Sequence, residues 1–93
     1  MYEIIYSRRF KTSYKRLDRS GRFDREEFGE VIELLEAGQE LPKKYFDHAL
    51  IGNLQAKREC HLASDILLVY EKHIEYKVIT LSDIGNHAHV FGS

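Results

Sequence analysis

Histidines lie at widely separated positions of this sequence, and their side chains could transfer protons in a reaction. His48 lies in a polar segment near the middle of the chain, His61 in an alternating segment, and His87 close to the last residue. Because imidazole titrates near neutral pH, one ring can accept a proton while another donates one. Transesterification of RNA needs both steps, since a base takes the proton of a 2′-hydroxyl group and an acid protonates the departing 5′-oxygen. If the three segments converge, these residues can perform ribonuclease chemistry.

A carboxylate and a cation accompany His61 in the same alternating segment. In "AKRECHLA", Lys57, Glu59 and His61 fall on every second residue, so they share one face of a strand. Cations near such a site stabilise the charge that builds on the phosphoryl oxygens. Lys43 and Lys44, which precede His48 by a few residues, are further candidates for RNA contact.

The last residues also alternate, with His87, His89 and Phe91 on every second position. If this segment is extended, the two imidazoles and the aromatic ring share one face. An aromatic side chain such as Phe91 can stack on an unpaired base of RNA. We therefore expect an extended tail beside an exposed surface of the protein.

The sequence contains neither HExxH nor CxxC, so we expect no metal or other cofactor. Cys60 is the only cysteine, which excludes an internal disulfide and fits a reducing cytoplasm. No apolar run reaches the roughly 18 residues that a membrane-spanning helix needs, so we expect no membrane contact.

Two helices are predicted in the first half of the chain, after a short strand at residues 2–6. Ser7 can cap the first helix, and Asp24 can cap the second. Glu27 follows Asp24 at the spacing of a capping box, in which it would bond back to the start of the helix. The few residues between the helices indicate an antiparallel helical hairpin.

The second half of the chain predicts a sheet. Residues 41–55 indicate a loop, and the period of the apolar residues then changes to two. Short connections between the later strands favour antiparallel pairing. The expected fold is therefore one α+β domain over residues 1–93, in which a β-α-α-β-β-β chain packs a helical hairpin on one face of a small, mainly antiparallel sheet. The other face is left free for a functional site.

Charge is unevenly distributed along the chain. The formal net charge is −1, but residues 1–22 carry a balance of +5 and residues 23–40 a balance of −6, while the remaining residues balance to zero. These values indicate one basic and one acidic helix surface. A basic surface of this kind is either simply solvated or meets a polyanion.

Three stretches, "YFDHALIG", "RECHLASDILLVYE" and "IGNHAHVF", resemble the YafQ-like branch of the RelE/ParE toxin superfamily, and the resemblance extends over nearly the whole chain. It implies a bacterial toxin that acts in the cytoplasm as an endoribonuclease. Such toxins cleave messenger RNA on the translating ribosome without a metal. A cognate antitoxin neutralises them, and the complex often binds operator DNA through the antitoxin.

The resemblance also implies site residues. It places His48, His61, Asp65 and His87 in or beside the active site, together with the aromatic ring of Phe91. As a hypothesis for their roles, His87 is the general acid or the principal proton-transfer residue. His48 and His61 are candidates for the base, and Asp65 orients one of them. Glu59 is expected to be a second orienting carboxylate.

One departure from the family pattern concerns the cation of the site. Relatives usually carry an arginine where this chain has Asp83, and a carboxylate there would repel RNA. Either another cation substitutes, or Asp83 leaves the enzyme weak or inactive. Lys57 is the expected substitute, whereas Arg58 has the opposite strand parity and is expected to be structural. Two alternatives stay open: a ParE-like toxin that binds gyrase without cleavage, and a degenerate toxin that only binds its antitoxin.

Overall fold

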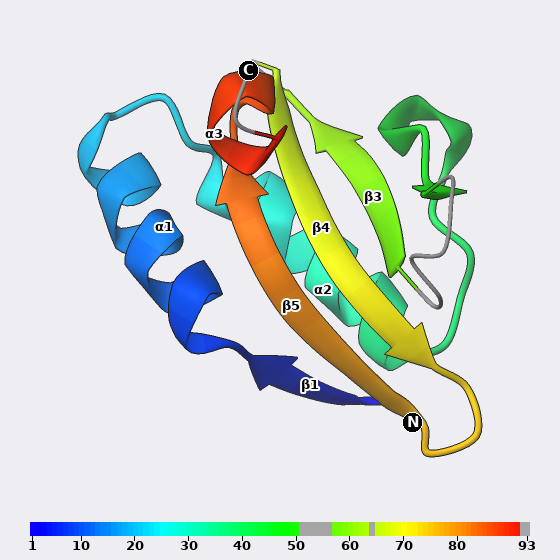
Figure 1. The fold of residues 1–93 in the computed structure, drawn as a ribbon. Coiled ribbons are helices and arrows are strands. Elements are labelled where there is room, and N and C mark those ends of the chain that lie inside the picture. Colours follow the sequence, from blue (N-terminus) through cyan, green and yellow to red (C-terminus); the bar gives the residue numbers. More distant parts are fainter. Residues whose placement is uncertain (51–56, 64, 92–93) are drawn as a thin grey trace.

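The computed structural model describes residues 1–50, 57–63 and 65–91. Five strands form one mixed sheet in the order β1-β5-β4-β3-β2, in which β1 and β5 run parallel and the other neighbours antiparallel (Figure 1). The elements, in chain order, are β1 (Glu3–Tyr6), α1 (Arg8–Arg19), α2 (Arg25–Glu36), the 3-10 helix η1 (Lys43–Tyr45), β2 (His48–Ala49), β3 (Lys57–Leu62), β4 (Ile66–His73), β5 (Val78–Gly85) and α3 (His87–Phe91). The predicted α+β class with a mainly antiparallel sheet is confirmed.

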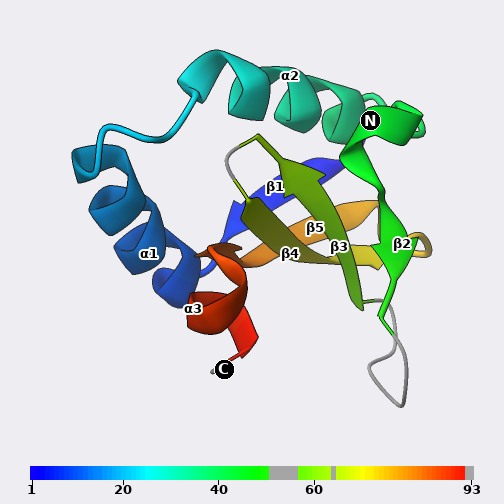
Figure 2. The ribbon, with the colours of Figure 1, turned by 90° about the horizontal axis from the view of Figure 1, so that it is seen from above.

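Helix α2 lies across one face of the sheet, and α1 lies along the β5 side, as the view from above shows (Figure 2). Val31 and Leu35 of α2 are buried in one core with Leu68 and Ile79 of the central strands. An aromatic cluster joins the two helices, in which Phe10 and Tyr14 of α1 contact the ring of Phe28 at centroid distances of 5.9 and 5.4 Å. The apolar residues of both helices therefore cover the same face of the sheet.

The predicted helix caps are present, with one difference. Ser7 Oγ accepts a hydrogen bond from Phe10 N at 3.1 Å, and Asp24 Oδ1 accepts from the amides of the two glutamates that follow Arg25. The expected capping box does not close, because Glu27 Oε1 accepts a bond from Ala63 N at 2.9 Å. Glu27 therefore ties α2 to the turn between β3 and β4.

Within the described residues, no helix is long and apolar enough to span a membrane.

The strand alternation predicted for β3 is confirmed. Cys60 and Leu62 belong to the core under the helices, while Lys57, Glu59 and His61 lie on the opposite face, which we call the open face. β4 is buried on both sides, because Leu67 and Val69 on the open face are only 3% and 6% exposed. Contacts between α3 and β4 account for part of this cover.

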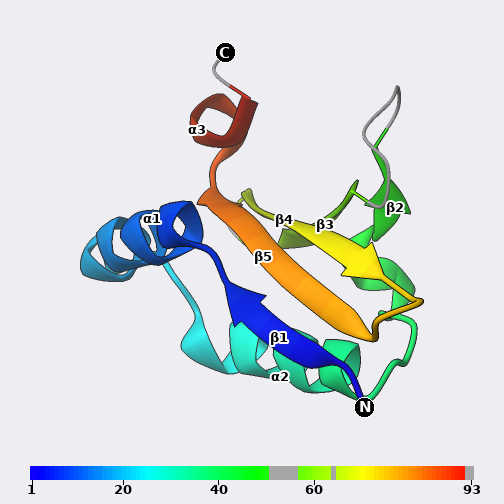
Figure 3. The ribbon, with the colours of Figure 1, turned by 60° about the horizontal axis from the view of Figure 1, so that its bottom comes forward.

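Two segments differ from the sequence expectations. The loop expected at 41–55 contains η1 and the short strand β2, although residues 51–56 lie outside the described part. The prediction of an extended tail is wrong, because residues 87–91 form α3. Asn86 explains this, since its side-chain oxygen accepts from His89 N at 2.7 Å and its carbonyl accepts from Val90 N at 3.0 Å. α3 and β2 stand on the same side of the sheet, away from α2 (Figure 3).

Candidate active site

A buried carboxylate on the open face brings two of the predicted histidines together. Glu59 Oε1 lies 3.2 Å from His61 Nε2 and 3.4 Å from His48 Nε2. The Glu59 side chain is only 8% exposed, whereas the rings of His48 and His61 are 50% and 42% exposed. The carboxylate is thus shielded from water, and both imidazoles keep an accessible edge.

The pairing of β2 with β3 produces this arrangement. His48 lies directly opposite Glu59 in the antiparallel register, and His61 follows Glu59 by two residues on the same face. The rings of His48 and His61 are 6.0 Å apart, and the ring of Phe46 stands edge-on to His61 at 5.8 Å. The two-residue strand β2 therefore positions His48, although the sequence predicts a loop in this segment.

His48 is also held from its other ring nitrogen. Its Nδ1 lies 2.7 Å from the carbonyl oxygen of Phe46, which adopts the left-handed conformation at φ 48°. Both ring nitrogens therefore face acceptor oxygens. A doubly protonated ring can donate to both, and a neutral ring to only one. A neutral His48 ring therefore donates either to Phe46 or to Glu59, but not to both.

A second network anchors the segment that carries His48. Asp47 accepts hydrogen bonds from Arg58 Nη2 at 3.0 Å, from Arg58 Nε at 3.3 Å and from the Tyr70 hydroxyl. Burial, followed by the bond to Asp47, raises the pKa of Tyr70 above its ordinary value. The hydrogen bond to Asp47 raises the pKa of Arg58. The expectation that Arg58 is structural agrees with its place in this network.

His87 and Phe91 lie on α3. They are four residues apart, and their rings are in contact at a centroid distance of 4.9 Å. His89 points elsewhere, because its Nε2 lies 2.9 Å from Ser13 Oγ of α1 and 3.4 Å from Asp83 Oδ1. The three residues expected on one extended face are thus divided: His87 and Phe91 remain together, while His89 holds α3 against α1. Within the described residues, the ring contact of His87 is with Phe91, not with His48 or His61.

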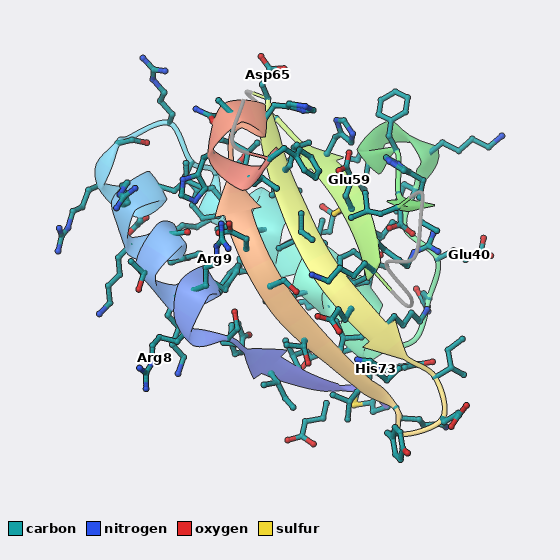
Figure 4. The ribbon with its side chains drawn as sticks, in the orientation of Figure 1. Arg8, Arg9, Glu40, Glu59, Asp65 and His73 are labelled. Atoms are coloured by element: carbon teal, nitrogen blue, oxygen red, sulfur yellow. The ribbon has the colours of Figure 1, made fainter. Side chains whose placement is uncertain are left out.

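The predicted second carboxylate, Asp65, is exposed in the turn between β3 and β4, where it has φ 58°. Figure 4 shows it at the tip of that turn, apart from Glu59 on β3. In the part of the chain that the structure describes, Asp65 has no hydrogen bond or ion pair with a histidine. Glu59 is the carboxylate in contact with His48 and His61.

The predicted RNA-binding cations flank this face. Lys57 Nζ lies 3.9 Å from Glu71 Oε2, and Lys57 lines a groove of about 400 Å³ on the open face together with Phe91. Lys43 and Lys44 are exposed on η1, where Lys44 Nζ lies 5.1 Å from the centre of the Tyr45 ring. The groove also contains Arg9 of α1, which the sequence reasoning did not select. Its position depends on the packing of α1 beside β5, which strand parity cannot reveal.

The group formed by His48, Glu59 and His61 has the composition of a metal-ligand set. One ligand atom from each residue lies within 4.8 Å of the others. Two imidazole nitrogens and one carboxylate oxygen suit a first-row transition ion such as Zn²⁺ or Cu²⁺, with a fourth position left for water. No sequence motif indicates this set, because His48 and Glu59 meet through strand pairing.

The two helices on a small mixed sheet, with histidines and a carboxylate on the open face, define a RelE-like toxin fold. Residues 2–92 match the family described as bacterial toxin of type II toxin-antitoxin system, YafQ, and the chain belongs to this family. It is 36% identical over 50 residues to the protein named YafQ in Haemophilus influenzae, a match that covers 52% of this chain and about half (49%) of that relative.

Solved structures resemble the whole chain. The crystal structure of a metal-bound toxin from Helicobacter pylori has a TM-score of 0.89 at 37% identity, covering 98% of this chain and 100% of that one. The E. coli DinJ-YafQ complex has a TM-score of 0.85 at 28% identity, covering 99% and 100%. The resemblance inferred from the sequence is therefore confirmed at the level of family and fold.

Proposed function

We propose that this protein is a ribosome-dependent endoribonuclease that cleaves messenger RNA and so stops translation. The observation that carries the proposal is the contact of His48 and His61 with one buried carboxylate, Glu59, on the face that the helices leave open. A gyrase-binding toxin has no need of paired proton-transfer groups. Membership in a family of type II toxins supports the same conclusion.

The reaction requires no metal in this proposal. His48 or His61 accepts the proton of the 2′-hydroxyl group, and Glu59 orients the two rings and stabilises the positive charge that results. The freed oxygen attacks the neighbouring phosphorus, and the bond to the 5′-oxygen breaks. His87 donates the proton to that departing oxygen. Phe91, whose ring is 42% exposed beside His87, stacks on a base next to the cleaved bond.

Lysines at the edge of the face hold the RNA backbone. Lys57 contacts it in the groove, and Lys43 and Lys44 contact it from η1. Asp65 remains a candidate for orienting RNA or a histidine at the β3–β4 turn. The ribosome supplies the extended messenger that the open face receives, which places the activity in the cytoplasm.

A cognate antitoxin covers α1 and masks the open face when growth continues. A solved complex of a relative, the E. coli DinJ-YafQ complex, supports such a partner. α1 is strongly basic and has no acidic residue in its first turn, so an acidic segment that folds on binding can lie along it.

The test is a translation reaction programmed with a defined messenger, to which the purified protein is added. We expect cleavage within codons, and a loss of at least about 100-fold in cleavage rate for His61→Ala and for His87→Ala. His73→Ala is the matched control, because His73 also contacts a carboxylate, Glu71 at 3.4 Å, but lies at the opposite end of β4 from Asp65 (Figure 4). Intact messenger with arrested supercoiling would indicate gyrase binding, and normal growth on expression would indicate a degenerate toxin.

We also propose that the group of His48, Glu59 and His61 binds a divalent transition-metal ion, which then inhibits cleavage. The mutual distance of the three ligand atoms supports this, as does the metal-bound relative from Helicobacter pylori. A bound ion would occupy the imidazole nitrogens that the reaction needs for proton transfer. Calorimetric titration with Zn²⁺ should give binding that His48→Ala and His61→Ala abolish and His73→Ala retains. Unchanged binding in the first two variants would contradict the site.

A further inference from the structure

Asp83 borders the groove on the open face, where a negative charge would repel the phosphates of RNA. It is only 5% exposed. A buried carboxylate needs donors, and Asp83 has them: Oδ2 accepts from Arg9 Nε at 3.0 Å, and Oδ1 accepts from Ile84 N at 2.9 Å. His89 Nε2 stands 3.4 Å from the same Oδ1. The negative charge is therefore compensated within the protein.

Arg9 neutralises the charge of Asp83, and its guanidinium is also placed to bind a further anion. Its side chain is 71% exposed although its Nε is fixed on a nearly buried oxygen. In the described residues, its two terminal nitrogens make no hydrogen bond, since the bond to Asp83 comes from Nε. A guanidinium held at Nε keeps its planar fork of terminal N–H donors in a set direction, which suits two-point recognition of a phosphate.

The side chain of Arg9 lines the groove. Figure 4 shows its side chain between α1 and β5, just below α3, whereas the neighbouring Arg8 points away from the sheet. Arg9 of α1, Phe91 of α3 and Lys57 of β3 all line this groove. A phosphate bound by the terminal nitrogens of Arg9 would lie nearer to the guanidinium than to Asp83, so attraction exceeds repulsion at contact distance.

We propose that Arg9 binds a phosphate of the RNA backbone in this groove and that Asp83 is the positioning residue that orients its guanidinium. This inference rests on the proposed ribonuclease function. It assigns the cation of the site to α1. Lys57, which the sequence favoured, then becomes a second and weaker contact, since its amine lies 3.9 Å from the Glu71 carboxylate and presents a point charge without a planar fork.

Single-turnover cleavage of ribosome-bound messenger tests the proposal. Arg9→Ala should lower the rate at least about 10-fold, and Arg9→Lys should recover part of it because the charge remains without the fork. Arg8→Ala is the matched control and should stay within about 2-fold of the unsubstituted protein. The double variant Arg9→Ala/Asp83→Asn should be no slower than Arg9→Ala alone, because a positioning residue has nothing left to orient.

A second measurement separates this proposal from the proposed function. Binding of a 2′-O-methyl oligoribonucleotide, which cannot be cleaved, should weaken in Arg9→Ala, and its dependence on salt should become shallower by about one ion. Weaker binding in Arg9→Ala with a protein that never cleaves would overturn the ribonuclease but retain the phosphate site. Equal cleavage and equal salt dependence in Arg9→Ala and Arg8→Ala, with unchanged thermal unfolding, would overturn the phosphate site alone.

Discussion

The hydroxyl of Tyr70 fixes the segment that carries His48, and its removal should destabilise the protein by a predictable amount. Tyr70 is 1% exposed, and its hydroxyl donates to Asp47, the residue before His48. A hydrogen bond to a charged group contributes about 1.5–3 kcal/mol to stability. Asp47 keeps both bonds from Arg58 after the change Tyr70→Phe, so we expect a loss near the middle of that range, about 2 kcal/mol.

Tyr45 provides a matched control for this prediction. It is also 1% exposed, but its hydroxyl has no hydrogen-bond partner within the described residues. Tyr45→Phe should therefore leave the free energy of unfolding unchanged or raise it by up to about 1 kcal/mol, because a buried hydroxyl without a partner is unfavourable. The two variants remove the same atom from equally buried rings, but only Tyr70→Phe should lower the free energy of unfolding.

Thermal and urea unfolding can measure both variants. For a chain of this length, a loss of about 2 kcal/mol lowers the unfolding midpoint by roughly 10 °C. The slope of the free energy against urea should not change, because the exposed surface is the same. Equal effects of Tyr70→Phe and Tyr45→Phe would refute the reasoning, since the bond to Asp47 would then contribute nothing.

Burial raises the pKa of Cys60 and of Tyr70 above their ordinary values of 9.0 and 10.0, so the unfolded chain releases these protons at lower pH than the folded protein. The free energy of unfolding should therefore fall as pH rises above about 9. Tyr70→Phe should make this fall less steep when stability is measured by urea unfolding at a series of pH values. Gly85→Ala would place a Cβ 2.6 Å from the ring of His89 and should lower the free energy of unfolding by about 1–3 kcal/mol. The Cβ of Gly29→Ala in α2 meets no atom within 4 Å, so this variant should raise the free energy of unfolding by about 1 kcal/mol. Thermal unfolding measures both changes. Reversing the charges of two exposed lysines of α1 (Lys11→Glu and Lys15→Glu) should weaken antitoxin binding at least about 10-fold in calorimetry, and equal affinity would exclude α1 as the binding surface.

The strands and helices could be predicted because their signals are local. Ser7 and Asp24 cap the helices where the sequence indicates, and the alternation of Lys57, Glu59 and His61 correctly assigns them to one face. Period-two spacing decides the face of a strand without any knowledge of the partner strand. The contact between Glu59 and His61 follows directly from that alternation.

The remaining features depend on contacts between distant segments. His48 meets Glu59 because a two-residue strand pairs with β3, a length too short to show a period. The extended tail was wrongly predicted, since alternating histidines resemble a strand while the capping side chain of Asn86 favours a helical turn. The bond between Arg9 and Asp83 joins residues 74 positions apart, so only the packing of α1 beside β5 reveals it.

The central claim is that Glu59 and His61 act as one proton-transfer unit on the open face. The most direct test is single-turnover cleavage of ribosome-bound messenger by Glu59→Gln, by His61→Ala and by the double variant, each checked for folding by thermal unfolding. If the two residues act as a unit, each single variant loses about 100-fold or more, and the double variant is no more than a few-fold slower than the slower single. Losses that multiply in the double variant, or a Glu59→Gln protein as fast as the unsubstituted one, would contradict the claim.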